Sequence, residues 1–261
     1  MRAMATSIDL NADVGESLGP WPMGEDEALI PLVSSVNVAC GAHAGDPRTI
    51  ERTIRLAATA GAAVGAHPGY PDLLGFGRRD LAMDPADLEA SIVYQVGAVA
   101  AFARDAGVEV HHVKPHGALY NAAARDPRLA ETVARAIRRC AMAALVCGPP
   151  GSALLAAAEA AGLATVAEAF PDRAYEPDGS LRSRRLPGAV LVDPAAVAER
   201  ALELARDGRI VATDGSEIAV AAQTLCLHGD TPGAAEHARA VRAALASAGI
   251  EVRPVPSPAS R

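Results

Sequence analysis

The sequence predicts an α/β fold in which parallel strands, each followed by a helix, form a single barrel. Short runs rich in valine and isoleucine alternate with alanine-rich stretches whose apolar residues recur at helical spacing. About seven such strands occur in one series, which fits a closed or nearly closed barrel better than two domains. Half of the 261 residues are hydrophobic, so the chain can bury one large core. A doubly wound open sheet of the same elements is the alternative.

The predicted elements follow one another along the whole chain. Strands are expected at residues 7–12, 34–40, 62–67, 108–114, 143–148, 164–170 and 222–229. Helices are expected at residues 46–61, 84–107, 126–139, 151–162, 193–208 and 231–249. Four helices begin with an Asp-Pro pair, in which the aspartate caps the first turn and the proline takes the first helical position. No linker-like tract interrupts the series, so one domain over residues 1–261 is predicted, with a loose tail from about residue 253.

Composition and charge argue against several classes of function. The net charge is −7 and no basic run or basic patch with interleaved aromatics occurs, so we expect no nucleic-acid partner. No stretch reaches the ~18–20 apolar residues that span a bilayer, and none is typical of a signal peptide, so we expect no membrane partner. The four cysteines show no CxxC pairing, which favours reduced thiols and a cytoplasmic protein.

Unusual polar residues follow the ends of the predicted strands. The carboxyl ends of parallel strands share one face, and active sites lie on that face. Four of the seven histidines fall in these turns, namely His43, His67, His116 and His228. Asp9, Asn11 and Asp13 share one parity of the first strand and can point together into the barrel mouth. Each residue alone has an ordinary explanation as a turn or core residue, but together they predict a site.

Lys114 is the only lysine in a chain that otherwise uses arginine. Its compact ammonium has rotatable donors that a planar guanidinium cannot imitate, although chance in an arginine-rich composition is the alternative. His111 and His112 lie within a strand on opposite faces, and we expect at least one to be structural; His237, on the last helix, is predicted to be solvated. No P-loop, dinucleotide-binding or nucleophile-elbow motif occurs, so any ATP site is unconventional or lies partly on another chain.

Six segments of the chain resemble, in order, segments of the LamB/YcsF family. They are DLNADVGES, SVNVACGAHAGDP, GAHPGYPDLLGFGRR, VKPHGALYN, DRAYEPDGSLRSR and CLHGDTPGA. The chain departs from the family pattern at Ala42, where a bulky residue is usual, and at Pro171, where a small residue is usual. The resemblance implies a deacetylase-like, seven-stranded (β/α) barrel. It also implies the A subunit of an ATP-dependent 5-oxoprolinase, which works with subunits B and C and converts 5-oxo-L-proline, ATP and water to L-glutamate, ADP and phosphate.

This reaction opens a stable lactam ring. The site therefore needs a grip on the substrate carboxylate, a base for water, a cation and an acid for the departing nitrogen. We assign Asp13 as the base, Lys114 as the cation that faces an oxyanion or phosphate, and His43 and His116 as proton-transfer groups. Arg79, Arg173 or Asn37 is expected to bind the substrate carboxylate. The full set of predicted substrate-binding residues is Asn11, Asn37, His67, Arg79, Glu168, Arg173 and His228.

Two other functions are compatible with these residues. The first is a stand-alone metal-dependent deacetylase or amidohydrolase, with Asp13, His43 and His67 as ligands. The second is a noncatalytic carrier protein within a complex, against which the density of titratable residues argues. The sequence leaves open whether a metal is bound, and whether ATP binds this chain or its partners.

Overall fold

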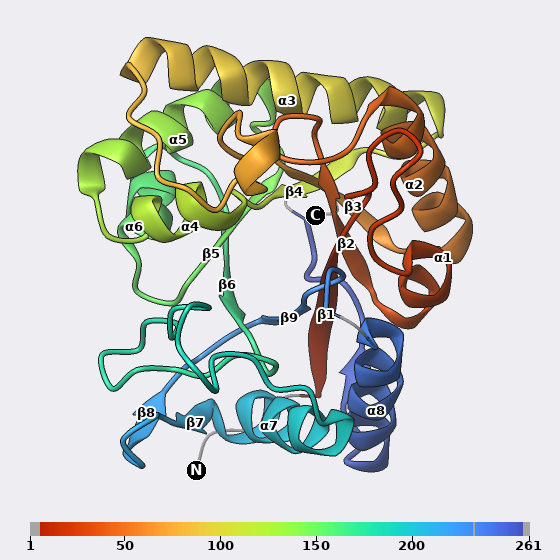
Figure 1. Cartoon of the computed structure of the whole chain (residues 1–261), viewed down its shortest axis with the longest axis vertical. Coiled ribbons are helices and arrows are strands. Elements are labelled where there is room, and N and C mark those ends of the chain that lie inside the picture. The colour runs from red at the N-terminus through yellow and green to blue at the C-terminus, as the bar shows by residue number, and fades with distance from the viewer. Residues whose placement is uncertain (1–5, 232, 258–261) are drawn as a thin grey trace.

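The computed structural model describes residues 6–231 and 233–257, and its centre is a closed barrel of parallel strands (Figure 1). Within these residues the barrel strands are β1 (Ser7–Val14), β2 (Ser35–Ala39), β3 (Ala63–His67), β4 (Val110–Val113), β5 (Leu145–Gly148), β6 (Thr165–Ala169) and β9 (Thr224–Leu227). They pair in that order, and β9 pairs with β1 to close the ring. The seven-stranded barrel is confirmed, and the open sheet is wrong.

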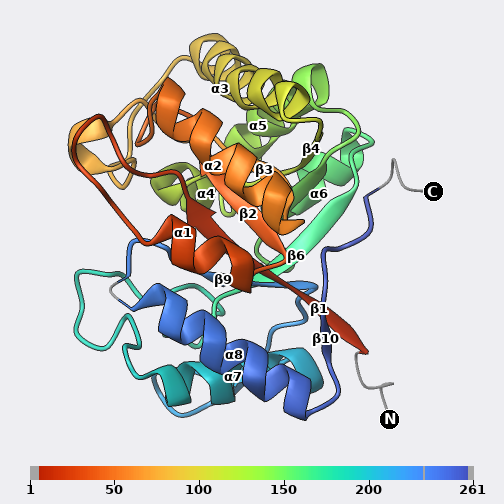
Figure 2. The same ribbon diagram turned by 90° about the vertical axis from the view of Figure 1, so that its right-hand side faces the viewer.

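Helices surround the strands. They are α1 (Asp26–Leu29), η1 (Ile30–Leu32), α2 (Pro47–Ala60), η2 (Leu73–Gly75), α3 (Pro85–Asp105), α4 (Gly117–Ala123), α5 (Pro127–Cys140), α6 (Ala153–Ala160), α7 (Pro194–Asp207) and α8 (Ala234–Ser247). Figures 1 and 2 show α3 and α5 on one side of the barrel and α7 and α8 on the opposite side. In the described ranges, none of the helices has the length and apolar character needed to cross a membrane.

The Asp-Pro pairs start helices as predicted. The side chains of Asp46, Asp84, Asp126 and Asp193 each accept a hydrogen bond from a backbone N–H in the first turn of α2, α3, α5 and α7. These bonds satisfy donors that have no partner inside the helix. The N-caps therefore set where each helix leaves the preceding turn.

Two small features differ from the prediction. The strands β7 (Arg209–Val211) and β8 (Glu217–Ala219) form an antiparallel hairpin between α7 and β9 that the sequence pattern does not predict. The tail expected to be loose from about residue 253 is held in its described part. Strand β10 (Glu251–Val252) pairs with β1, and Val255 packs against Leu145, Cys147 and Val166 of the barrel. Residues 258–261 lie outside the described residues.

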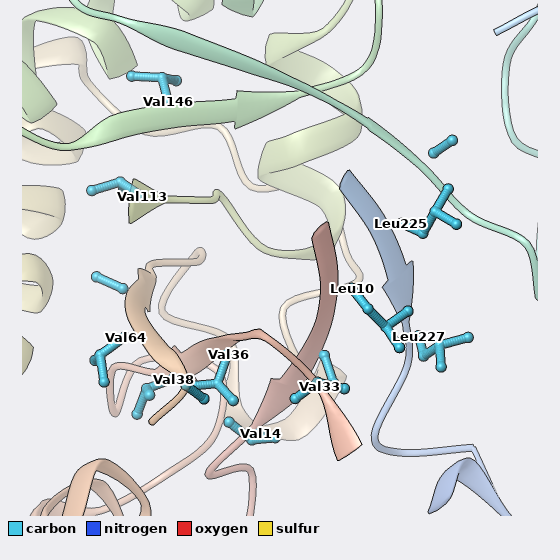
Figure 3. Packing of buried hydrophobic residues seen from close by; sticks show 14 of the residues in the cluster. Leu10, Val14, Val33, Val36, Val38, Val64, Val113, Val146, Leu225 and Leu227 are labelled. Atoms are coloured by element: carbon cyan, nitrogen blue, oxygen red, sulfur yellow. The ribbon is translucent and has the colours of Figure 1, made fainter. Parts of the chain in front are cut away.

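Alternate residues of each barrel strand face opposite sides. Figure 3 shows one set, including Val36, Val64, Val113 and Leu225, in the hydrophobic cluster that also contains helix residues. The intervening residues face the barrel interior, and many of them are buried polar groups. They include Asp9, Asn11, Asp13, Asn37, His112, Glu168 and Thr224. The interior is therefore a polar network, and its end at the carboxyl ends of the strands forms the candidate site.

Candidate active site

Lys114 lies just after β4 and its side chain is only 3% exposed. Its ammonium is 3.0 Å from Oδ1 of Asp13, 3.0 Å from Oε1 of Glu168 and 2.9 Å from Sγ of Cys226. Burial alone would lower the pKa of this ammonium, but Asp13, Cys226 and Glu168 raise it well above its ordinary value. Its three donors all have partners, so Lys114 faces two carboxylates of the protein rather than an open position for a phosphate oxygen.

Amide and hydroxyl groups hold the same two carboxylates. The side-chain amide of Asn37 donates to Oδ1 of Asn11 at 2.6 Å and to Oδ1 of Asp13 at 2.8 Å. Asn11 donates to Oε1 of Glu168 at 3.0 Å, and the Tyr120 hydroxyl donates to Oε2 of Glu168 at 2.9 Å. Because these donors are used inside the network, Asn11 and Asn37 orient carboxylates and offer no free N–H to a ligand.

Two histidines meet beside Asp13 through facing ring nitrogens. Nδ1 of His67 lies 2.7 Å from the carbonyl oxygen of Lys114, and Nε2 of His116 lies 2.8 Å from that of Phe76. A carbonyl can only accept, so both of these nitrogens carry a proton. The remaining nitrogens, Nε2 of His67 and Nδ1 of His116, face each other at 2.9 Å. Burial, and then His43 and His67, lowers the pKa of His116 well below its ordinary value. When both rings are neutral, two lone pairs oppose each other, and a shared proton or a metal ion would relieve that repulsion.

Asp13 lies beside this pair. Its Oδ2 lies 3.5 Å from Nε2 of His67. Burial alone would raise the pKa of Asp13, but His67 and Lys114 hold it well below its ordinary value. The centre of the barrel thus combines buried groups of opposite charge in direct contact.

His43 adds a third ring to the group. It stacks on His116 with ring centroids 3.7 Å apart and planes 3° from parallel. Both of its ring nitrogens are buried and have no hydrogen-bond partner among the described residues. Burial, and then His67, lowers the pKa of His43 well below its ordinary value, so the ring is neutral. Buried polar atoms without partners are uncommon, and this one leaves a nitrogen free for a ligand.

The same residues could hold a metal ion. One ligand atom from each of His43, His67 and His116 lies within 4.8 Å of the others, and the same is true of Asp13, Glu16 and His116. Imidazole nitrogens and carboxylate oxygens suit zinc and similar divalent ions. His67 and His116 also direct their other nitrogens to carbonyls, as metal-bound histidines usually do. The donor set therefore fits a divalent ion.

Gly77 makes room for these rings. Its φ is +62°, which favours glycine, and a Cβ at this position would lie 2.7 Å from Cδ2 of His116 and 2.8 Å from Cβ of His43. Gly65 serves His112 in the same way, because a Cβ there would lie 2.2 Å from Nε2 of that ring. The glycines of this region are needed for close packing of the histidines.

A ring of aromatic and acidic residues borders the network. Nδ1 of His228 lies 2.7 Å from Oδ2 of Asp172, and the His228 ring stacks on Phe170 with centroids 5.4 Å apart. The Lys114 ammonium lies 5.3 Å from the centre of the Phe170 ring. A cavity of about 370 Å³ opens onto this region, and Phe170, Glu168 and Tyr120 belong to its wall. Its volume lies within the range of small-molecule sites, ~300–1,000 Å³.

Comparisons with known proteins identify the family. The model of the LamB/YcsF family matches residues 8–260. The chain belongs to the LamB/YcsF family. It is 54% identical over 247 residues to the A subunit of 5-oxoprolinase from Chloroflexus aggregans, covering 95% of this chain and 98% of that protein. It is 50% identical over 246 residues to the A subunit of 5-oxoprolinase from Thermus thermophilus, covering 94% of this chain and 98% of that protein.

Solved structures agree with the family assignment. The lactam utilization protein from Thermus thermophilus superposes with a TM-score of 0.90 at 48% identity, covering 95% of this chain and all of that one. A putative cellobiose-phosphate cleavage protein from Enterococcus faecalis superposes with a TM-score of 0.55 at 12% identity, covering 95% of this chain and 97% of that one. The second likeness shows the fold alone. The resemblance drawn from six sequence segments is confirmed.

Most of the predicted site residues of this LamB/YcsF chain meet in one cluster. Its members are Asn11, Asp13, Asn37, His43, His67, Lys114, His116 and Glu168. His228 joins the edge of the cluster through Phe170. Arg79 and Arg173 are elsewhere: Arg79 pairs with Asp72 and its side chain is 57% exposed, while Arg173 donates to the carbonyl oxygens of Ala189 and Arg182.

Some residues play parts that the sequence pattern does not predict. Tyr120 follows His116 by four residues, so helical spacing in α4 was a usable signal for it. Cys226 contacts Lys114, which lies 112 residues away in sequence, and only the closed barrel brings them together. The prediction that His237 is solvated is wrong. The residue is 2% exposed because it lies on the face of α8 that also buries Ala238 and Val241.

His112 belongs to the polar interior. It is 5% exposed and its Nε2 lies 2.7 Å from Oδ1 of Asn37. Since that oxygen accepts, the His112 ring donates and fixes the orientation of the Asn37 amide. The expectation that His111 or His112 is structural is confirmed by this contact.

Proposed function

We propose that this chain is the A subunit of an ATP-dependent 5-oxoprolinase, which opens the lactam ring of 5-oxo-L-proline to give L-glutamate with hydrolysis of ATP. The observation that carries the proposal is the 54% identity to the A subunit of a 5-oxoprolinase over 95% of this chain. The buried cluster of carboxylate, ammonium and imidazole groups at the barrel mouth supports it. We propose that subunits B and C are the partners and that the complex works in the cytoplasm.

The proposed chemistry has three steps. The bond between the terminal phosphorus of ATP and ADP breaks, and a new P–O bond forms to the lactam oxygen. Water then attacks the ring carbon, the C–N bond breaks, and the nitrogen receives a proton. A second water releases phosphate and leaves glutamate. These steps need charge stabilisation at the lactam oxygen and a route for protons, which a buried preorganised site supplies.

The chain's residues can be assigned to these needs. The cavity beside Glu168, Tyr120 and Phe170 is the proposed site of the lactam ring. Asp13 and the facing nitrogens of His67 and His116 form the proposed proton-transfer group, since they lie in contact. Lys114, which contacts Asp13 and Glu168, is proposed to hold both carboxylates at fixed positions. His43 contributes a free ring nitrogen beside them.

The donor set also supports a second candidate, a metal-dependent hydrolase that works alone. His43, His67 and His116 would hold the ion, together with Asp13 or Glu16. A divalent ion at this position would polarise a carbonyl oxygen or a water molecule. The test is to measure the metal content and the thermal midpoint of unfolding before and after dialysis against a chelator. Loss of bound metal together with a lower midpoint indicates a metal site, whereas no bound metal and an unchanged midpoint indicate a shared proton.

The proposed function is tested by reconstitution. Glutamate release from 5-oxoproline is measured with ATP for this chain alone, for subunits B and C alone, and for the mixture. We expect ATP-dependent release only in the mixture. Absence of release from a mixture of folded, associated subunits would contradict the proposal, and release by this chain alone without ATP would favour the metal-dependent hydrolase.

A further inference from the structure

A second cavity, of about 440 Å³, lies beside the barrel mouth. Arginines supply seven of its 13 lining residues, and Asp80 is the only carboxylate on the described lining. The whole chain has a net charge of −7, so this concentration of positive charge runs against the average of the molecule. A cavity lined by one sign of charge concentrates ligands of the opposite sign.

Part of the arginine wall is rigid. Arg173 is 6% exposed, and its guanidinium donates to the carbonyl oxygen of Arg182 at 2.6 Å and to that of Ala189 at 3.1 Å. Arg182 in turn lies 2.9 Å from a carboxylate oxygen of Glu176. Burial, and then the nearby charge of Arg184, lowers the pKa of Arg173 to about 10. Arg173 and Arg184 therefore lie close enough to repel each other.

Three other guanidiniums on the wall are available. Arg125, Arg184 and Arg185 make no side-chain hydrogen bond or ion pair with any residue in the described ranges. Arg125 and Arg185 are exposed, and Arg184 is half-buried. Guanidinium groups carry fixed forks of N–H donors that match phosphate and carboxylate oxygens in pairs. Asp172 and Asp178 attract Arg184 and Arg125 without forming an ion pair with them, so both guanidiniums keep donors for an anionic ligand.

The cavity adjoins the candidate active site. Arg78, on its wall, lies 4.7 Å from the centre of the Phe76 ring, and the Phe76 carbonyl accepts from Nε2 of His116. Phe76 has a φ of +53°, which is uncommon for a residue other than glycine and typical of functional sites. Asn121, Arg125 and Leu181 line both this cavity and the 370 Å³ cavity, so the two are adjacent.

We propose that the arginine-lined cavity binds the phosphate chain of a nucleoside triphosphate, with its terminal phosphate toward the barrel mouth. This inference rests on the proposed function, which requires phosphate to reach the lactam oxygen. The three guanidiniums without a hydrogen-bond partner in the described ranges exceed what one substrate carboxylate needs, and they suit a ligand with several anionic groups in a row. This site would explain how a chain without a P-loop can hold ATP.

Direct binding tests the inference without turnover. Binding of ATP, tripolyphosphate and 5-oxoproline to the purified chain is measured separately by calorimetry at one fixed ionic strength. We expect the chain to bind ATP and tripolyphosphate, and Arg184→Ala and Arg125→Ala each to weaken both by about tenfold or more. Arg138→Ala is the matched control, because it removes an exposed arginine on α5 outside both cavities. It should leave binding unchanged.

The complete complex provides the second measurement. With subunits B and C, Arg184→Ala should raise the KM for ATP more than the KM for 5-oxoproline. A raised KM for 5-oxoproline alone would show that the cavity binds the substrate carboxylate and would overturn the proposal. Unchanged KM values for ATP in both arginine variants would also overturn it, while leaving the 5-oxoprolinase function intact. If the chain binds tripolyphosphate but supports no glutamate release, the phosphate site in the arginine-lined cavity stands and the proposed 5-oxoprolinase function is rejected.

Discussion

The barrel centre and the arginine-lined cavity both concentrate charge, but they satisfy it differently. At the centre, the Lys114 ammonium has three partners, and Asp13 and Glu168 each accept several hydrogen bonds. In the cavity, Arg125, Arg184 and Arg185 have no hydrogen-bond or ion-pair partner for their side chains among the described residues. Internal pairing fixes side-chain positions, whereas unpaired groups remain open to a ligand. The comparison indicates a rigid centre beside a receptive cavity.

The largest effect should follow from removing the central cation. In Lys114→Met, Asp13 and Glu168 face each other across a buried space without a positive charge between them. Breaking a buried ion pair in this way typically costs about 3–5 kcal/mol, so we expect a loss of that order in the free energy of unfolding, measured with urea. Loss of less than ~1 kcal/mol would show that the centre is less tightly coupled than its contacts imply.

The conservative change at the same position separates geometry from charge. Lys114→Arg keeps one positive charge but puts a larger planar group into a fully occupied space. We expect circular dichroism to show a folded chain and glutamate release with subunits B and C to fall by at least about 100-fold, because small displacements of reacting groups have effects of this size. Near-normal turnover would contradict the assignment of Lys114 to the reacting centre.

Removing a single hydroxyl from the centre should have a medium effect. Tyr120→Phe takes away the donor to Oε2 of Glu168, which is a buried oxygen. Leaving a buried acceptor without its donor costs about 1–3 kcal/mol, and the free energy of unfolding should fall by that amount. Tyr94→Phe on α3 is the matched control, because it removes a hydroxyl from a side chain that is 76% exposed, and it should leave the free energy of unfolding unchanged.

The sequence predicts those parts of the site that depend on local patterns, and it does not predict contacts between residues far apart in the chain. Asp13, His67 and Lys114 were predictable because the strand ends of a parallel barrel share one face. The contact between Lys114 and Cys226 was not predictable, because it depends on how β9 pairs with β1 when the barrel closes. Arg184 lies on a long loop without regular structure, and no periodicity indicates which way its side chain turns.

Asp172 lies between the barrel centre and the arginine-lined cavity, and its contribution to the free energy of unfolding should depend on pH. Burial alone would raise the pKa of Asp172, but His228 and then Arg173 and Arg184 lower it. A carboxylate with a depressed pKa in the folded state stabilises the protein above its unfolded pKa, and this contribution is lost as pH falls toward the folded pKa. We expect Asp172→Asn to reduce the acid-induced loss of unfolding free energy below about pH 4. An unchanged pH profile in urea titrations would contradict the charge coupling.

The smallest effect is expected at the exposed edge of the cavity. Arg79 pairs with Asp72 on a loop, and its side chain is 57% exposed. Exposed ion pairs contribute little because water and salt screen them. Arg79→Ala should therefore leave the thermal midpoint of unfolding unchanged within error, in low and in high salt. A clear decrease in the midpoint would mean that the arginine wall has a structural role.

The most direct test compares one variant from each region in the same assay. Glutamate release with subunits B and C is measured at varied ATP for Lys114→Arg and Arg184→Ala. The account predicts that Lys114→Arg lowers kcat and leaves the KM for ATP nearly unchanged, while Arg184→Ala raises that KM more than it lowers kcat. If the two variants change the same parameter to the same extent, the division between a reacting centre and a phosphate-binding cavity is wrong.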